Sequence, residues 1–248
     1  MNARIGKFGF INNLLPYFRL EHDGIPIIEA PPAKLAAMFG GGEIDFAPVP
    51  SFYYLKNKGS LRTYDFCVAA KDKVLSVLVV SKKEQLENGS IAITNQTMTS
   101  LNLLKIILIE RKMKNSLVPV NESGASDLLK HSSHALVIGD EAIKARRTCN
   151  VVMDLGEEWH RLTGCSMVFG ISVSRKDADM SEVNEKVMES VRWGEKNIHR
   201  IATEAEKKFG LRKDFLEMYF ESLTYRMGPE EARGIELFEQ KCRQYNLL

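Results

Sequence analysis

Residues 90–139 read "SIAITNQTMTSLNLLKIILIERKMKNSLVPVNESGASDLLKHSSHALVIG", and they alternate strand-like with helix-like segments. Short apolar runs at 90–94, 116–121 and 134–139 are typical of strands, whereas 99–113 and 124–131 have helical spacing. The predicted order is therefore strand, helix, strand, helix, strand. This order is typical of a parallel sheet that is covered by helices.

The N-terminal part of the chain repeats that order. Strands are expected at 4–10, 25–30 and 43–49, with helices at 12–20 and 31–39 between them. Two copies of one α/β unit indicate two lobes. Two further β-rich stretches, 73–82 and 166–175, bracket the second copy, and we expect them to carry the chain between the lobes.

The second lobe is therefore predicted to be an insertion into the first. We place the first lobe at residues 1–80 and 172–248 and the inserted lobe at 81–171. The tail is expected to return to the first lobe mainly as helices, one of them spanning 181–209 and ending before Gly210. The fold class is α/β, with two lobes hinged around a cleft.

Composition narrows the class of function. The chain has 248 residues and a formal charge of +2, with both signs scattered, so neither nucleic acid nor a membrane surface is an expected partner. No apolar run approaches the roughly 18 residues that a membrane span needs. The N-terminus has no signal-peptide pattern, and the four cysteines are widely spaced, so we expect a cytoplasmic protein with reduced thiols that serve packing.

Polar, uncharged residues follow the predicted strands where a cleft would lie. In open parallel sheets, ligands bind beyond the carboxyl ends of the strands, where helix N-termini offer free N–H groups. The segments 10–13, 48–51, 94–100 and 138–142 occupy these places and predict a site for a small carboxylate or phosphate. The candidate residues are Asn12, Asn13, Ser51, Thr97, Thr99, Ser100, Gly139 and Asp140.

Simpler interpretations exist for some of these residues. Asn12, Asn13 and Thr99 have the side chains of ordinary helix caps, and for Asp140 a cap is the favoured interpretation over ligand binding. The "HSSH" at 131–134 lacks a third metal ligand and is interpreted as a solvated turn. We therefore expect neither a metal nor an organic cofactor.

Six segments of the chain carry a family resemblance. They are "GFINNLLPYF", "LAAMFGGGEIDFAPVPSFYYL", "LSVLVVSK", "IAITNQTMTSLNLLKIIL", "ALVIGDEAI" and "DLGEEWHRLTGCSMVFGISVSRKD". In this order they resemble the menaquinone-biosynthesis family of the futalosine pathway, and within it the chorismate dehydratases. The resemblance implies a two-lobed fold like that of type 2 periplasmic binding proteins. It also implies a lyase that removes water from chorismate to give 3-[(1-carboxyvinyl)oxy]benzoate.

The resemblance also implies roles for particular residues. The family's N-x-x-P element matches Asn13 with Pro16, and the serine that opens its first crossover strand matches Ser76, so these two are the expected catalytic residues. Thr99 and Ser100 match its helix-opening pair. No acid or histidine stands at a matching position, so the substrate's own enolpyruvyl carboxylate is the expected proton acceptor.

Two other functions remain as alternatives. The sister enzyme that cyclises dehypoxanthine futalosine has a histidine where this chain has Gly139 and an N-D-T element where it has "NNLL". A non-catalytic protein that binds or senses a small carboxylate would share the fold. The sequence leaves open the oligomeric state, the lobe that holds each carboxylate, and the choice between Asn12 and Asn13 as the functional amide.

Overall fold

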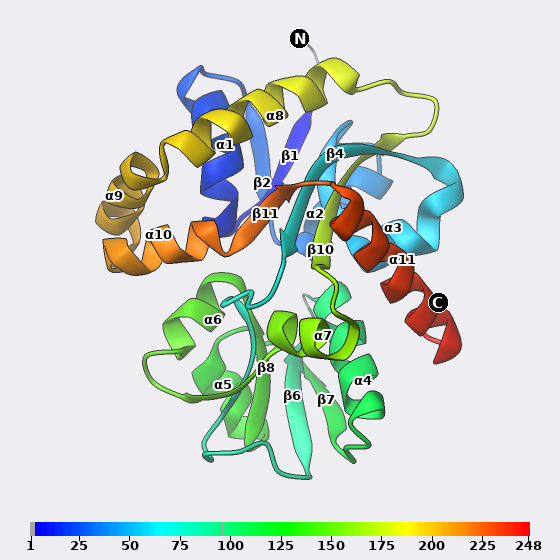
Figure 1. The fold of residues 1–248 in the computed structure, drawn as a ribbon, viewed down its shortest axis with the longest axis vertical. Helices are drawn as coiled ribbons and strands as arrows, with labels where there is room; N and C mark the ends of the chain where they lie inside the picture. The colour runs from blue at the N-terminus through cyan, green and yellow to red at the C-terminus, as the bar shows by residue number, and fades with distance from the viewer. Residues whose placement is uncertain (1–2, 96) are drawn as a thin grey trace.

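The structure is a computed structural model that describes residues 3–95 and 97–248. Its described strands form three sheets, distributed over an upper and a lower lobe (Figure 1). The first lobe contains β1 (Ile5–Phe8), β2 (Ile27–Ala30), β3 (Ala47–Pro50), β4 (Leu61–Ala70), β10 (Met167–Arg175) and β11 (Leu223–Arg226). The second contains β5 (Val77–Ser81), β6 (Ser90–Thr94), β7 (Ser116–Val120), β8 (His134–Ile138) and β9 (Asn150–Asp154).

The first lobe is built from a parallel pair and a four-stranded sheet. Strand β1 pairs with β2 in parallel, and a parallel bridge from Ile5 to Phe46 connects this pair with the segment that leads into β3. The larger sheet has the order β11-β4-β10-β3, in which β10 is antiparallel to both neighbours. The helices of this lobe are α1 (Leu14–His22), α2 (Pro32–Gly40), α3 (Ser51–Asn57), α8 (Ser181–Lys196), α9 (Ile198–Phe209), α10 (Lys213–Glu221) and α11 (Pro229–Gln244), with short 3-10 turns η1 (Ile11–Asn13) and η2 (Lys58–Ser60).

The second lobe is a five-stranded sheet with the order β7-β6-β8-β5-β9. Strand β6 is parallel to β7 and β8, whereas β5 is antiparallel to β8 and β9. Its helices are α4 (Thr99–Glu110), α5 (Ala125–His131), α6 (Gly139–Ala145) and α7 (Leu155–Thr163).

Both predicted strand-helix repeats are confirmed as β1-α1-β2-α2-β3 and β6-α4-β7-α5-β8. The stretches 73–82 and 166–175, expected to carry the chain between the lobes, contain β5 and β10, and both of these are inner strands of their sheets. Each enters its sheet from the other lobe and is antiparallel to both of its neighbours. The four-stranded sheet is therefore antiparallel throughout, whereas the five-stranded sheet is mixed. The chain changes sheet between Ala70 and Val77 and between Asp154 and Met167, so the predicted boundaries at 80/81 and 171/172 cut through β5 and β10.

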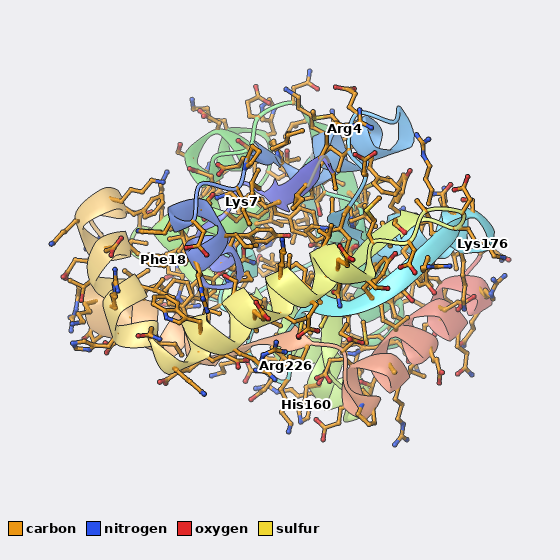
Figure 2. The ribbon with its side chains drawn as sticks, turned by 90° about the horizontal axis from the view of Figure 1, so that it is seen from above. Arg4, Lys7, Phe18, His160, Lys176 and Arg226 are labelled. Atoms are coloured by element: carbon orange, nitrogen blue, oxygen red, sulfur yellow. The ribbon has the colours of Figure 1, made fainter. Side chains whose placement is uncertain are left out.

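The predicted helix over 181–209 is divided into α8 and α9 at Asn197. The Asn197 backbone leaves the helical region, with φ −126° and ψ 24°, and its side chain donates to the Trp193 carbonyl oxygen at 2.7 Å. Gly210 ends α9 in the left-handed conformation, as expected. Figure 2 shows α8 from above, lying across the first lobe beside α1, where the Phe18 ring stacks on Trp193 at 5.4 Å.

Two polar side chains are more buried than their sequence context indicates. Lys7 of β1, labelled in Figure 2, is 5% exposed and forms ion pairs with Glu21 and Glu29. His134, expected in a solvated turn, is instead 2% exposed in β8. Its burial corrects that interpretation, because β8 lies in the interior of the five-stranded sheet between β6 and β5.

Candidate functional site

A cavity lined by residues of both lobes brings together most of the predicted site residues. Of the predicted residues, those that line it are Asn12, Ser76, Thr97, Thr99, Ser100 and Gly139. Asn13, Ser51 and Asp140 are not among the lining residues.

The walls of the cavity are largely apolar and carry no charged side chain within the described residues. Phe8, Phe10 and Phe169 contribute aromatic surface, and Pro32 and Pro50 contribute aliphatic surface. The polar groups are concentrated at the start of α4 and around positions 12 and 76. This arrangement suits a small ligand with an apolar ring and one or two polar substituents.

The first turn of α4 provides the richest set of hydrogen-bonding groups in the cavity. Met98 is the N-cap and makes no side-chain cap bond to any residue that the structure describes. Thr99 was interpreted as a possible cap, but its hydroxyl accepts from the Phe52 N–H in the first lobe at 3.2 Å. Because α4 begins at the cavity wall, the N–H groups of its first turn and the Ser100 hydroxyl lie where they can donate to an anion in the cavity.

Other members of the segment 94–100 contribute less. The Asn95 amide donates to Asn121 at 2.8 Å on the surface and is not a wall residue. Gln96 lies outside the described residues. The surplus of polar groups in this stretch is therefore only partly directed at the cavity, through Thr97, Thr99 and Ser100.

Asn12 and Asn13 form a hydrogen-bonded pair in η1. The Asn13 amide nitrogen donates to the Asn12 side-chain oxygen at 2.7 Å, and neither residue makes the predicted side-chain cap within the described chain. Asn12 lines the cavity, whereas Asn13 is fully buried and its side-chain oxygen has no partner among the described residues. A buried amide oxygen without a partner is uncommon in folded proteins.

Ser76 lies immediately before β5 and faces the same cavity. Its hydroxyl donates to the Val74 carbonyl oxygen at 3.3 Å, which is long for such a bond. Its own carbonyl oxygen accepts from the Gly139 N–H at 2.7 Å. Burial raises the pKa of Tyr219, and its interaction with the nearby Ser76 side chain opposes that rise. The Tyr219 hydroxyl makes no well-aligned hydrogen bond to the described residues, so Ser76 is its polar neighbour rather than a firm partner.

Asp140 corrects an interpretation made from the sequence. Helix α6 begins at Gly139, and the Asp140 side chain accepts from the Ile11 N–H at 2.9 Å instead of capping its own helix. Burial raises the pKa of Asp140, and this hydrogen bond opposes the rise. The N–H group at the start of η1 is thereby used by the protein itself and is not free to bind a ligand.

Ser51 also differs from its predicted role. The side chain is fully buried, and its hydroxyl donates to the Val168 carbonyl oxygen at 2.6 Å. This bond connects the start of α3 to β10, so the Ser51 hydroxyl proton is not available to a ligand.

Gly139, in the second lobe, lies against the Phe10 ring of the first lobe. Its φ is +60°, a conformation that favours glycine, and a Cβ atom there would lie 2.5 Å from carbons of the Phe10 ring. A side chain at position 139 would therefore strain the backbone and require the Phe10 ring to move.

Sequence reasoning missed the aromatic walls and the tyrosines behind the site. Phe169 lies in a segment interpreted as a connection, and nothing in the pattern of 213–226 singles out Tyr219 or Tyr225. The Tyr225 hydroxyl donates to the Asn12 carbonyl oxygen at 2.7 Å and so supports the η1 turn from the C-terminal region. In residues 3–95 and 97–248, no group of three or more His, Cys, Asp or Glu side chains is placed to hold a metal ion, and no helix is long and apolar enough to cross a membrane.

Comparisons with known proteins agree with this architecture. The structure of protein AF1704 from Archaeoglobus fulgidus superposes with a TM-score of 0.82 at 16% identity, over 99% of this chain and 98% of the other. The alkanesulfonate-binding protein SsuA from Xanthomonas axonopodis pv. citri, bound to MOPS, gives a TM-score of 0.71 at 15% identity, over 99% and 92% of the two chains. At such identities the likeness shows the fold, which is that of periplasmic binding proteins.

Sequence comparison is more specific. Chorismate dehydratase from Thermus thermophilus is 27% identical over 253 residues, which cover 94% of this chain and 92% of that protein. The profile described as menaquinone biosynthesis matches residues 3–244, nearly the whole chain. The chain therefore belongs to the menaquinone biosynthesis family.

Proposed function

We propose that this protein is a chorismate dehydratase, a hydro-lyase of the futalosine route to menaquinone. One observation supports the proposal most strongly. This chain is similar to a chorismate dehydratase along nearly its whole length, and its cavity has no charged side chain in the described wall and has the first turn of α4 at one side. The four free cysteines suit a reducing compartment, so a cytoplasmic location belongs to the same proposal.

The cavity supports chorismate as the substrate. Chorismate is a small ring acid with two carboxylates, and the start of α4 provides N–H groups and hydroxyls for one of them without a formal cation. The rings of Phe8, Phe10 and Phe169 provide apolar surface for the ring of the substrate. In this proposal the second carboxylate, on the enolpyruvyl group, lies toward Ser76 and the Asn12–Asn13 pair.

The lining residues also support the proposed chemistry. The reaction removes the C3 proton and the C4 hydroxyl as water, and the ring becomes aromatic, so the enzyme's task is to orient and polarise the substrate. The described wall contains no His, Asp, Glu or Lys to act as a base. We therefore assign the proton transfer to the substrate's enolpyruvyl carboxylate, which passes the proton to the departing C4 hydroxyl. Ser76 at the cavity wall and Asn13, through its hydrogen bond to Asn12, hold the carboxylate in place.

Gly139 argues against the sister reaction on dehypoxanthine futalosine. The corresponding residue of that enzyme is a histidine, whereas here the left-handed backbone and the Phe10 ring disfavour a side chain. The shape of this cavity therefore favours the dehydratase.

The deciding experiment is to incubate the purified protein with chorismate and to follow the products by liquid chromatography and mass spectrometry. We expect loss of one water and formation of 3-[(1-carboxyvinyl)oxy]benzoate, with the same rate after treatment with a chelator. Unchanged chorismate would overturn the proposal. A thermal shift by chorismate without conversion would instead indicate a carboxylate-binding protein.

A further inference from the structure

The loop that carries Ser76 contains a backbone conformation that its residue type disfavours. Leu75 has φ +61°, in the left-handed region where a Cβ atom clashes with the backbone. Such a conformation persists only when the surroundings hold it, and it is concentrated at functional sites. The residue directly after it is Ser76, which lines the cavity.

The group that holds this conformation is the carboxylate of Asp154, at the end of β9. One oxygen accepts from the Leu75 N–H at 2.8 Å, and the other accepts from the Val74 N–H at 3.1 Å. Asp154 also caps α7 through the N–H groups of Gly156 and Glu157, at 3.0 and 3.2 Å. A cap requires only the latter two bonds, so the bonds to the Ser76 loop are additional.

The start of α7 packs closely against the loop that carries Ser76. A Cβ atom at Gly156 would lie 2.5 Å from the Asp72 carbonyl oxygen and 2.9 Å from the Val74 nitrogen. The Asp154 side chain is 6% exposed, and burial raises its pKa against the effect of its backbone hydrogen bonds. The folded protein thus keeps a carboxylate in a costly environment at the point where the chain enters the second lobe.

We infer that Asp154 is a positioning residue for Ser76, acting through the left-handed turn at Leu75. The carboxylate fixes the two residues before Ser76, and the Gly139 N–H fixes the Ser76 carbonyl oxygen. The Ser76 hydroxyl is thereby held at the cavity wall although its own hydrogen bond is long. In its catalytic part this inference rests on the proposed function.

The first test replaces Asp154 by Asn, which has the same size and is an equally good helix cap. One side-chain oxygen remains for α7, but the amide that replaces the other oxygen cannot accept from Leu75. We expect kcat for chorismate to fall by about tenfold or more, with KM changed by less than about threefold, because a displaced catalytic group affects turnover. Asp179→Asn, at an Asp that accepts from the Ser181 N–H far along the chain, is the matched control and should leave kcat unchanged.

A second pair of variants separates positioning from folding. Leu75→Gly loses a buried side chain but adopts the left-handed turn readily, whereas Leu75→Val keeps most of the packing but strongly disfavours that turn. We expect Leu75→Val to have the lower kcat even though it keeps more of the packing. If kcat instead follows packing in this pair, or if Asp154→Asn keeps the wild-type kcat, the inference is wrong.

Amide hydrogen exchange tests the contact without reference to the reaction. The Leu75 N–H should exchange faster in Asp154→Asn than in the wild type, whereas those of Val74 and Gly156, which share the retained oxygen, should not. Wild-type exchange at Leu75 would overturn the inference. If the wild type fails to convert chorismate while the Leu75 amide still depends on Asp154, then the proposed function fails but the positioning of Ser76 stands.

Discussion

The most informative single change is Ser76→Ala compared with Ser81→Ala. The two serines stand at opposite ends of β5 and are similarly buried, 2% and 1% exposed, but only Ser76 lines the cavity. The Ser76 hydroxyl makes one long bond of 3.3 Å, so its removal should cost about 0.5 kcal/mol of unfolding free energy. If this hydroxyl orients the reacting carboxylate, kcat should fall by about 10², or about 2.7 kcal/mol in the activation free energy.

Ser81→Ala should show the opposite pattern. Its hydroxyl donates to the Ser133 carbonyl oxygen at 3.2 Å and accepts from the Lys83 N–H at 2.8 Å. The loss of both bonds should cost about 1–2 kcal/mol, which lowers the Tm of a chain of this size by about 2–8 °C. Its kcat should stay at the wild-type value.

The assay measures kcat and KM for chorismate together with the thermal midpoint of each variant. Activity should fall in the more stable variant and persist in the less stable one. A Ser76→Ala protein with kcat within about threefold of the wild type would refute the catalytic role of Ser76. So would a loss of activity that follows Tm in both variants.

Three further predictions concern the neighbouring polar groups. Asn13→Ala should lower kcat by about 10², and because it removes a fully buried side chain with its 2.7 Å bond to Asn12, it should also lower the unfolding free energy by about 1–3 kcal/mol. Asn12→Ala should mainly raise KM; steady-state kinetics showing the reverse would contradict this. Burial raises the pKa of Asp140, so the wild type loses stability as the pH rises through that pKa. Urea unfolding should therefore find Asp140→Asn more stable than the wild type at about pH 8, with a smaller difference at about pH 4. A variant less stable than the wild type at about pH 8 would contradict this prediction. Tyr219→Phe removes a buried hydroxyl without an aligned partner and should raise the unfolding free energy by up to about 1 kcal/mol. A clear decrease of the unfolding free energy would instead mean that Tyr219 forms a true hydrogen bond with Ser76.

The repeated units were predictable because their periodicity is local. Helices such as α1 and α4, and the short apolar strands around them, can be recognised from the spacing of apolar residues within a short stretch of sequence. The placement of β5 and β10 was not predictable in this way, since an apolar run looks the same in a connection and in an inner strand. Their true position depends on which sheet edge the returning chain meets.

The polar residues show the same limit. The sequence correctly indicated that the side chains of Thr99 and Asp140 accept hydrogen bonds at helix starts, but it suggested donors within the same helix. Their partners, Phe52 and Ile11, stand 47 and 129 positions away. Local pattern reveals the capacity of a side chain to bond, whereas the identity of a distant partner follows only from the assembled fold.

The close approach of Gly139 to Phe10 has a consequence for genetic screens. A glycine codon becomes an alanine codon by a single nucleotide change, and the added methyl group would meet the Phe10 ring at 2.5 Å. Such an allele would leave every polar group of the cavity in place, yet it would require the Phe10 ring or the facing lobe to shift. If Ser76 is catalytic as proposed, a survey of inactive alleles should therefore find position 139 beside Ser76, although the effect at position 139 comes from steric contact alone.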